Sequence, residues 1–310
     1  MATIIVSGGG SLLVAGGGSL SLNGGGGGGG VTPIDPETAA GAALILYSDD
    51  VGIDQGGASN SGAPYATTWN DRVNASYQLT RGPSWAGRGD VVVIENDSLL
   101  NGHNSLRTRF ANGQYSRGRM EGPENSALPY GNGTPWTMYF VGYQVDNSES
   151  FNNAAGWGVS SGRHRVAAGT INLSGTLQAV ANSADDYGYE ASNNTPGGQL
   201  ARSQGALGPV LNQPFILSVV FPGDTYSTAQ VFCNGAEAAG QAGGGYSVFV
   251  DAGEREVQVG SGPGAPGNAP QFFWPGSIGF FAVYSQTHDT TTRQGIEKFL
   301  ANYYAISYPL

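Results

Sequence analysis

Two neighbouring stretches near the C-terminus carry most of the information on the fold: Trp274-Pro-Gly-Ser-Ile-Gly-Phe-Phe-Ala-Val-Tyr284 and Ile296-Glu-Lys-Phe-Leu-Ala-Asn-Tyr-Tyr304. The first is an apolar, aromatic run that begins after a Pro-Gly pair and ends in tyrosine, which is typical of a strand. The second repeats its apolar residues at i, i+3, i+4 and i+7 and predicts a helix within 291–304 with one apolar face. We therefore expect a strand, a polar loop and a closing helix.

Upstream, the chain has further β-branched or aromatic runs bounded by Gly, Pro, Asn or Asp: 89–94, 136–141, 215–221, 229–233, 246–250 and 256–259. An Ala-rich segment, 37–45, is the other helix signal. Gly-rich stretches at 52–62, 193–208 and 260–270 are predicted to be long surface loops. The pattern predicts an all-β fold, a two-sheet antiparallel jelly-roll sandwich with a short C-terminal helix.

Composition agrees with this fold class and excludes several functions. The 310 residues include 52 Gly and 16 Pro, which disfavour helices, while 39% of the chain is hydrophobic and can form a core. The net charge is −10 and there is a single lysine, so we expect no nucleic-acid partner. One cysteine, Cys233, excludes an intramolecular disulfide and is expected to be buried and inert. No stretch approaches the ~20 apolar residues of a membrane-spanning helix.

Residues 1–30 differ from the rest and are predicted to be a separate Gly-rich N-terminal arm, with residues 31–310 forming the β-domain. Short apolar runs alternate with Gly triplets, and seven glycines close the segment. A flexible leader is one interpretation, and an assembly arm whose strands pair with another chain is the other. The arm residues concerned are Ile4, Ile5, Val6, Leu12, Leu13, Val14, Leu20 and Leu22. Without a basic n-region or a continuous apolar core, no signal peptide is expected, and synthesis is assigned to the cytoplasm.

The order of segments resembles laminin-G and concanavalin A-like jelly-roll domains. The two C-terminal stretches are similar to the closing strand and helix of that family. Earlier elements that also fit in order are Trp69-Asn-Asp71, Asp90 to Asp97, Pro135 to Val141 and Val231-Phe-Cys-Asn-Gly235. The resemblance covers about residues 40–306, and it does not include the arm.

The arm, the low charge and the abundance of Asn, Ser, Thr and Gly resemble tailed-bacteriophage virion structural proteins. This resemblance implies a capsid decoration or head-fibre protein on the virion surface, made in the host cytoplasm, with other virion proteins of the capsid, neck or tail as partners. A homo-oligomer, by analogy a trimer, is expected. The alternative is a carbohydrate-binding adhesin or receptor-binding module of a phage tail or fibre, which would bind a host-surface glycan.

We expect no enzymatic activity, and a glycoside hydrolase is the remote alternative. Such enzymes need two carboxyl groups on one face, and alternate strand residues provide that arrangement. Glu95-Asn-Asp97 is the nearest match, but no third acid follows it. There is no Gly-x-Ser-x-Gly motif. His103, His164 and His288 are expected to be solvated surface histidines.

Aromatic residues in loops are the candidates for stacking on a glycan: Trp85, Tyr130, Trp157, Tyr187 and Tyr189. By contrast, Trp69, Trp136 and Trp274 fall in the segments that resemble the fold family and are expected in its core or rim. No cofactor is expected. Calcium is an option that the resemblance raises, with Asp49, Asp50, Asp54 and Asp146 as candidate ligands, although ordinary loop acids are the favoured interpretation. Arg107-Thr-Arg109 and Arg117-Gly-Arg119 form a local basic cluster for which a solvated sheet face is favoured.

Overall fold

The computed structural model describes most of the β-domain in segments. These are residues 30–56, 63–82, 90–108, 118–129, 134–145, 151–158, 165–171, 176–182, 199–202, 210–223, 230–237, 256–260 and 274–309. Residues 31–310 form one compact unit. The arm residues 1–29 lie outside the described residues, so the assembly arm and its boundary stay predictions. No helix in the described part of the chain is long and apolar enough to cross a membrane.

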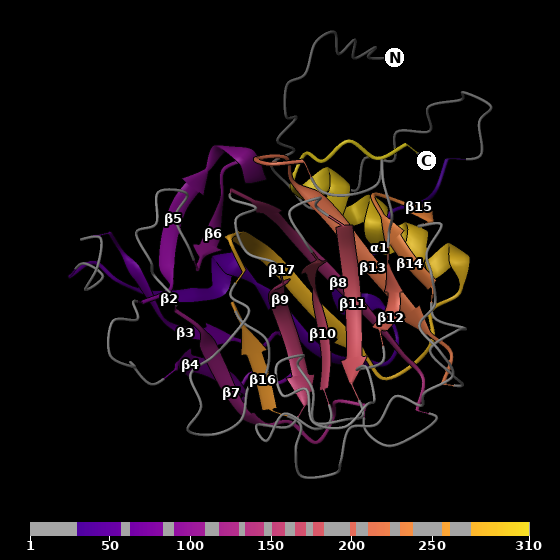
Figure 1. Cartoon of the computed structure of the whole chain (residues 1–310), viewed down its shortest axis with the longest axis horizontal. Coiled ribbons are helices and arrows are strands. Elements are labelled where there is room, and N and C mark those ends of the chain that lie inside the picture. Colours follow the sequence, from indigo (N-terminus) through magenta and orange to yellow (C-terminus); the bar gives the residue numbers. More distant parts are fainter. Residues whose placement is uncertain are drawn as a thin grey trace, which may run out of the picture. The chain divides into compact units, whose positions relative to one another are not determined.

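The first sheet is antiparallel, and in it β17 (Gly276–Tyr284) lies between β8 on one side and β1 with β6 on the other (Figure 1). Its strands lie in the order β1 (Ala42–Tyr47), β17 (Gly276–Tyr284), β8 (Trp136–Gln144), β13 (Phe215–Phe221), β14 (Gln230–Cys233) and β15 (Ala236–Glu237). At its beginning, β17 pairs with β6 (His103–Arg107), which forms a hairpin with β5 (Val92–Asp97). The edge of β17 is therefore shared between β6 and β1.

The second sheet is also antiparallel. Its strands follow the order β2 (Val51–Asp54), β3 (Tyr65–Asn70), β4 (Gln78–Arg81), β7 (Met120–Glu124), β16 (Glu256–Val259), β9 (Phe151–Gly158), β10 (Arg165–Ile171), β11 (Thr176–Asn182) and β12 (Gln199–Arg202). A single pairing of Tyr65 with Val92 connects it to β5 and so to the first sheet.

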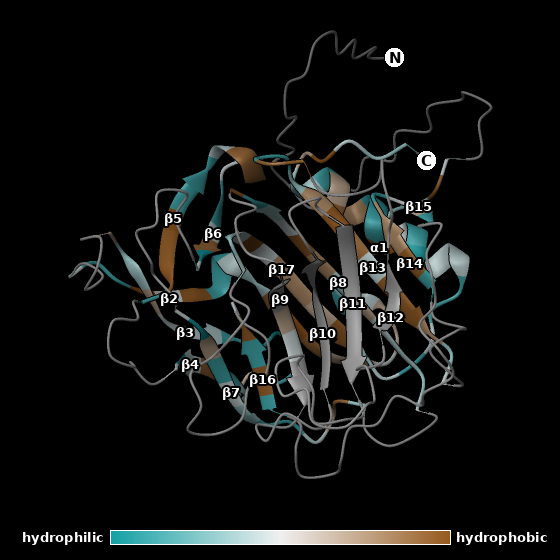
Figure 2. Cartoon of the chain, in the orientation of Figure 1, coloured by the Kyte–Doolittle hydropathy of each residue, from teal (hydrophilic) through white to brown (hydrophobic). Residues whose placement is uncertain are grey.

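The main core lies between the two sheets. Side chains alternate along a strand, so each strand of the first sheet sends every second residue into this core. Along β8, Met138 and Phe140 point into it and pack with Trp69, Met120 and Val257 of the second sheet. Figure 2 shows the hydrophobic residues concentrated along β8, β13 and β17. The two sheets and this core are the sandwich that the sequence predicts.

A second core lies on the other face of the first sheet, under helix α1 (Thr290–Tyr303). It holds the alternate residues of the same strands, such as Tyr139 and Val141 of β8, together with Ile296 and Leu300 of the helix. Asp289 caps the helix by accepting a 2.7 Å hydrogen bond from the backbone N–H of Thr292. The predicted apolar face of the helix is confirmed. The remaining helical turns are short: η1 (Pro36–Thr38), η2 (Ser48–Asp50) and η3 (Ser98–Leu100).

A bulge at Gly279 changes which residues of β17 face each core. The register against β8 shifts between Ile278 and Phe280, so these residues face opposite cores although they are two apart. A Cβ on Gly279 would lie 2.9 Å from Leu100 Cδ1 and 3.1 Å from Tyr304 Cε1. Glycine is therefore needed for this close approach.

Two local predictions are wrong. The Ala-rich segment 37–45 is not a helix: it holds η1 and the first part of β1, because pairing with β17 and burial on both faces outweigh helix propensity. The stretch 193–208 contains β12 and is not only a loop. By contrast, the strands predicted at 215–221 and 256–259 have those bounds in the structure.

Candidate functional site

The second sheet carries a row of polar side chains on the face opposite the main core, of which Gln258 is buried. Thr68, Thr80, Glu121 and Gln258 are register partners across β3, β4, β7 and β16. Directly opposed residues of antiparallel strands point to one face, and the intervening Met120 and the two valines of β16 point into the core. The row therefore forms the outer surface of the sheet, on which α1 does not lie.

Arg119 and Glu121 form an ion pair on this outer face. The Arg119 Nε contacts the Glu121 Oε1, and the two side chains are 10% and 26% exposed. Gly82 makes room for them, since a Cβ there would lie 2.9 Å from Arg119 Cγ and 3.1 Å from Glu121 Cδ. The Gly82 N–H also donates a 2.9 Å hydrogen bond to the carbonyl of Arg119.

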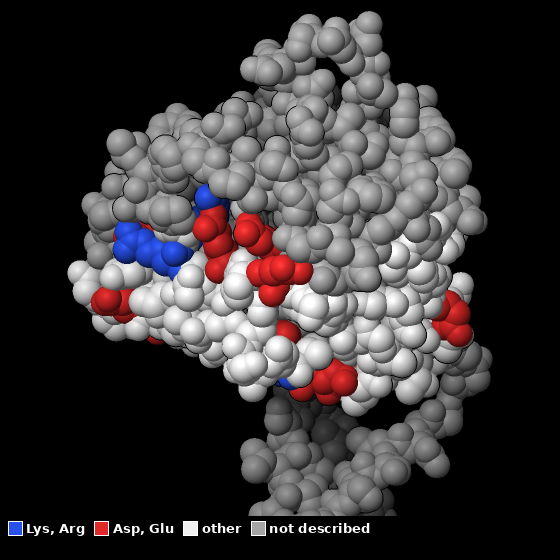
Figure 3. Space-filling model, turned by 90° about the horizontal axis from the view of Figure 1, so that it is seen from below, with Lys and Arg blue, Asp and Glu red and all other residues white. Residues whose placement is uncertain are grey.

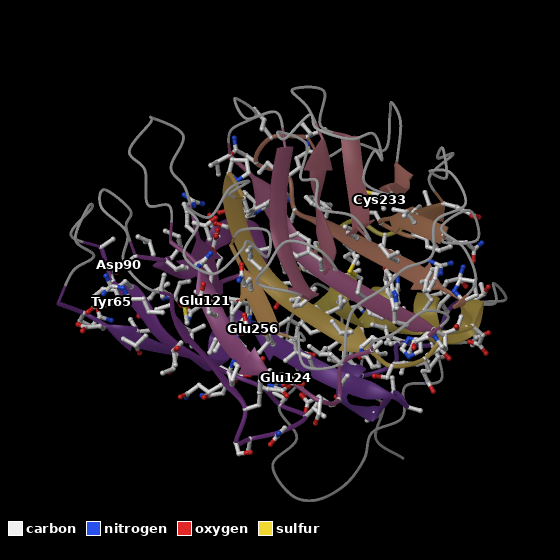
Figure 4. The ribbon with its side chains drawn as sticks, turned by 60° about the horizontal axis from the view of Figure 1, so that its bottom comes forward. Tyr65, Asp90, Glu121, Glu124, Cys233 and Glu256 are labelled. Atoms are coloured by element: carbon white, nitrogen blue, oxygen red, sulfur yellow. The ribbon has the colours of Figure 1, made fainter. Side chains whose placement is uncertain are left out.

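Two further carboxylates lie beside this pair. Glu256 of β16 is the register partner of Glu124 of β7, so two acids stand opposite each other on neighbouring strands. Figure 4 shows Glu121, Glu124 and Glu256 close together on β7 and β16, while Tyr65 and Asp90 lie together at another part of the sheet. Like charges in directly opposed positions destabilise a sheet. We name Arg119, Glu121, Glu124 and Glu256 the carboxylate strip.

The electrostatics of the strip follow from burial and from this excess of acid. Burial raises the pKa of Glu121, the charge of Glu256 raises it further, and Arg119 opposes both effects. Burial also lowers the pKa of Arg119, although both glutamates stabilise its positive charge. Figure 3 shows acidic side chains gathered beside basic ones on the face seen from below.

The Arg119 guanidinium has an unused hydrogen-bonding group. Its Nη1 is buried and has no hydrogen-bond partner among the described residues. A buried donor without an acceptor costs about 1–3 kcal/mol. The strip thus combines carboxylates with a guanidinium on one face of the sheet, the kinds of acceptor and donor that can hydrogen-bond to hydroxyl groups.

The candidate calcium ligands do not converge. Asp49 accepts hydrogen bonds from the backbone N–H of Asn104 and from the Tyr303 hydroxyl, and it contacts His103 Nδ1. Asp50 forms an ion pair with Arg72. Asp54 accepts hydrogen bonds from Tyr65 and from the Gly56 N–H, and both bonds lower its pKa. Asp146 lies outside the described residues, among which no group of three or more His, Cys, Asp and Glu residues could hold a metal ion.

Glu95 and Asp97 do not share a face, although alternate strand residues normally do. Asn96 between them has a φ of 52°, and the β5–β6 register is irregular there. Glu95 is consequently exposed, whereas Asp97 is buried and accepts hydrogen bonds from the hydroxyls of Ser105 and Tyr143. The pair does not provide two adjacent catalytic carboxyl groups.

The histidine prediction is wrong for His288, which is 4% exposed. Its Nδ1 lies 2.8 Å from the Tyr139 hydroxyl and its Nε2 lies 3.4 Å from the carbonyl of Ala40. The loop from β17 to α1 folds back over the second core and buries the ring, which sequence alone does not indicate. His103 is half-buried and stacks on Tyr303, with ring centroids 3.9 Å apart. His164 lies outside the described residues.

Cys233 is buried as predicted, and burial raises its pKa to about 12, so it is a poor nucleophile.

Three tryptophans expected in the core or rim are fully buried: Trp69, Trp136 and Trp274. The cluster of four arginines is described only at Arg107, which donates a hydrogen bond to Ser277, and at Arg119.

The candidate glycan-stacking residues are not tested. Four lie outside the described residues: Trp85, Tyr130, Tyr187 and Tyr189. Trp157 lies in strand β9, where its backbone pairs with Val166 and Val257, and not in a loop.

Sequence reasoning missed the carboxylate strip. Arg119 immediately precedes β7 and Glu121 is its second residue, so an extended chain there would have placed the two side chains on one face once β7 was recognised. The partners Glu124 and Glu256 are 132 positions apart in the chain. Only the pairing of β7 with β16 brings them together.

No protein-family model matches the chain, and no curated protein matches it. Among solved structures, domain 4 of AbnA, a GH43 extracellular arabinanase from Geobacillus stearothermophilus, in complex with arabinotriose, is similar. It has a TM-score of 0.50 and 11% identity over 85% of this chain and 98% of that chain.

Two other similar structures are more distant. The sialidase of Trypanosoma rangeli in complex with 2,3-difluorosialic acid gives a TM-score of 0.49 with 12% identity over 88% of this chain. This chain spans 36% of that sialidase. A SAP-like pentraxin from Limulus polyphemus gives 0.38 with 15% identity, covering 55% of this chain and 70% of the pentraxin.

The chain therefore has a concanavalin A-like jelly-roll fold, as the sequence resemblance predicts. The identities are low, so the likeness concerns the fold and does not extend to ligands.

Proposed function

We propose that this chain is a carbohydrate-binding module that binds sugar on the outer face of its second sheet, at the carboxylate strip. The observation that carries the proposal is the register row of Thr80, Glu121 and Gln258 beside Arg119 and Glu256. Carboxylates, a hydroxyl and a guanidinium on one rigid sheet supply the acceptors and donors that sugar hydroxyls need.

The fold likeness supports the same proposal. The similar domain 4 of AbnA is described in complex with arabinotriose, so one domain of this architecture holds an oligosaccharide. A site on adjacent strands is more rigid than one on loops.

We infer a binding role without catalysis. Glu95 and Asp97, the acids closest to the hydrolase pattern, lie on different faces of β5. A hydrolase would release reducing ends from a bound polysaccharide, and the carboxylate strip would then be its active site.

The virion role stays our prediction from the sequence. It depends on the Gly-rich arm of residues 1–30, of which 1–29 lie outside the described residues. We propose on the same basis that the chain has virion partners, forms a trimer and lies on the virion surface. The sugar-binding and virion proposals are compatible, because an adhesin would use its arm for attachment and its β-domain for the glycan.

Affinity gel electrophoresis in gels that contain arabinan, xylan or mixed-linkage β-glucan tests the sugar-binding proposal. We expect at least one polysaccharide to retard the protein and Glu121→Ala to lose most of the retardation. Glu237→Gln is the matched control, because Glu237 is an exposed acid on β15 of the first sheet. The proposal is wrong if no gel retards the protein, or if Glu121→Ala behaves like the control. A reducing-end assay on the same mixtures detects hydrolysis.

A further inference from the structure

The chain enters the β-domain over the closing helix. The backbone N–H of Ile34 donates a 2.9 Å hydrogen bond to the carbonyl of Gly295 in α1. A Cβ on Gly295 would lie 2.5 Å from Ile34 Cδ1 and 3.0 Å from the carbonyl oxygen of Thr32, so a side chain at this position would displace the entering segment. Residues 32–34 therefore lie directly on the helix.

Residues 31–41, which we name the N-terminal strap, are held along the same side of the domain. The buried Tyr284 hydroxyl donates a 2.8 Å hydrogen bond to the carbonyl of Pro36. Ile34 and Ala39 pack against the second core, which lies under α1. The chain that precedes the strap thus starts from the α1 side of the domain.

The proposed sugar site lies on the opposite side. The second sheet is separated from α1 by the main core, the first sheet and the second core. Gln78 and Thr80 of β4 are exposed on the outer face of this second sheet, because the intervening Leu79 points into the main core. Packed sheets lie about 10 Å apart and a helix is about 10 Å thick, so about 20 Å of protein separates the strap from that face.

The length of the arm limits where an attached partner can lie. The 29 residues that precede the described part of the chain would span on average about 30 Å as a Gly-rich coil. A domain the size of residues 31–310 is about 50 Å across. A protein that pairs with the arm is therefore held near the strap, on the α1 side.

Resting on the proposed sugar-binding function, we infer that the β-domain is a two-sided connector. A protein partner attached through the arm faces α1, and the outer face of the second sheet stays open. One chain can then hold its protein partner and a polysaccharide at the same time.

Site-specific attachment of the full chain to a surface tests the two sides. Cys233 is buried and its pKa is raised to about 12, so a biotin maleimide reacts with an introduced cysteine instead. Thr32→Cys places the label on the strap, and Gln78→Cys places it on the outer face of the second sheet. Both positions are exposed, which makes the variants a matched pair.

Each labelled protein is measured twice against arabinan, xylan and mixed-linkage β-glucan: free in solution by calorimetry, and on a streptavidin sensor by biolayer interferometry. The protein attached at Thr32→Cys should bind within about twofold of its affinity when free. The protein attached at Gln78→Cys should bind about tenfold more weakly or worse, because the sensor then covers the sugar face. Circular dichroism checks that both variants are folded.

The outcomes separate this inference from sugar binding itself. If attachment at Thr32→Cys weakens binding tenfold, or if attachment at Gln78→Cys leaves it unchanged, the two-sided arrangement is wrong while sugar binding by the free protein stands. A folded Gln78→Cys protein that loses binding when labelled and free supports the arrangement, since the label then obstructs the site directly. If no free protein binds any of the three polysaccharides, sugar binding fails and the inference fails with it.

Discussion

Glu297 is the most informative residue for testing how the closing helix holds the domain together. Its side chain is fully buried, and both of its carboxylate oxygens accept hydrogen bonds from Arg293 Nη1, at 2.8 and 2.6 Å. The Tyr308 hydroxyl donates a third bond of 2.6 Å. The Arg293 guanidinium lies 3.6 Å from the centre of the Phe232 ring, so the pair joins α1 to β14 and to the C-terminal tail.

Replacing Glu297 with leucine leaves the positive charge of Arg293 buried without a counter-charge. Removing one member of a buried ion pair costs about 3–5 kcal/mol, and the tyrosine hydroxyl that loses its acceptor adds about 1 kcal/mol. We expect Glu297→Leu to lower the free energy of unfolding by about 4–6 kcal/mol. In a chain of this size, each kcal/mol lost lowers Tm by about 2–4 °C.

Replacing both charges should restore most of the loss. An apolar pair of similar volume does not pay for desolvating two ions, so Arg293→Met with Glu297→Leu should be at least about 2 kcal/mol more stable than the sum of the single variants predicts.

Urea denaturation followed by tryptophan fluorescence measures all four proteins of the cycle. Glu37→Gln is the control, because its partner Arg72 is a third exposed and such a pair contributes less than about 1 kcal/mol. The reasoning is refuted if Glu297→Leu costs no more than this control, or if the double variant loses the full sum.

Three further predictions concern pH and close packing. Burial lowers the pKa of His288 below its ordinary 6.5, so the unfolded chain takes up a proton at a higher pH than the folded chain does. The free energy of unfolding should therefore fall as the pH drops through 6.5 towards the folded pKa. The urea midpoint of His288→Gln should depend less on pH than that of the unchanged protein. Glu121 has a raised pKa, so its stabilising effect is present below pH 4.5 and is lost as pH rises through the folded pKa. Glu256→Gln should move the NMR titration midpoint of Glu121 down, and an unchanged midpoint would contradict their coupling. A Cβ on Gly276 would overlap the backbone carbonyl of Tyr143, so Gly276→Ala should cost about 3 kcal/mol in urea denaturation.

Local sequence patterns were sufficient for the architecture. The strand ending at Tyr284 and the helix up to Tyr303 were predictable, because a strand alternates its faces and a helix repeats every 3.6 residues whatever lies around them. The fold class followed, since several such strands with Gly and Pro turns can bury their apolar faces only against one another.

Local patterns failed where a distant partner outweighed them. The Ala-rich segment became β1, whose other edge is closed by remote groups: the Ile45 N–H donates to Asp71 and the Tyr47 carbonyl accepts from the Trp69 indole. The buried Glu297 was likewise unexpected, because its i,i+4 partner Arg293 would usually mark a solvated helix face.

The candidate site depended on tertiary structure almost entirely. Arg119 and Glu121 are two residues apart, but the sequence predicted no strand there and gave no reason to join them to Glu256. Strand order and register set that contact, and both are fixed by how the two sheets bury their cores. A local pattern records which side chains share a face, whereas the charge and hydrogen bonding of a surface depend on which strands lie side by side.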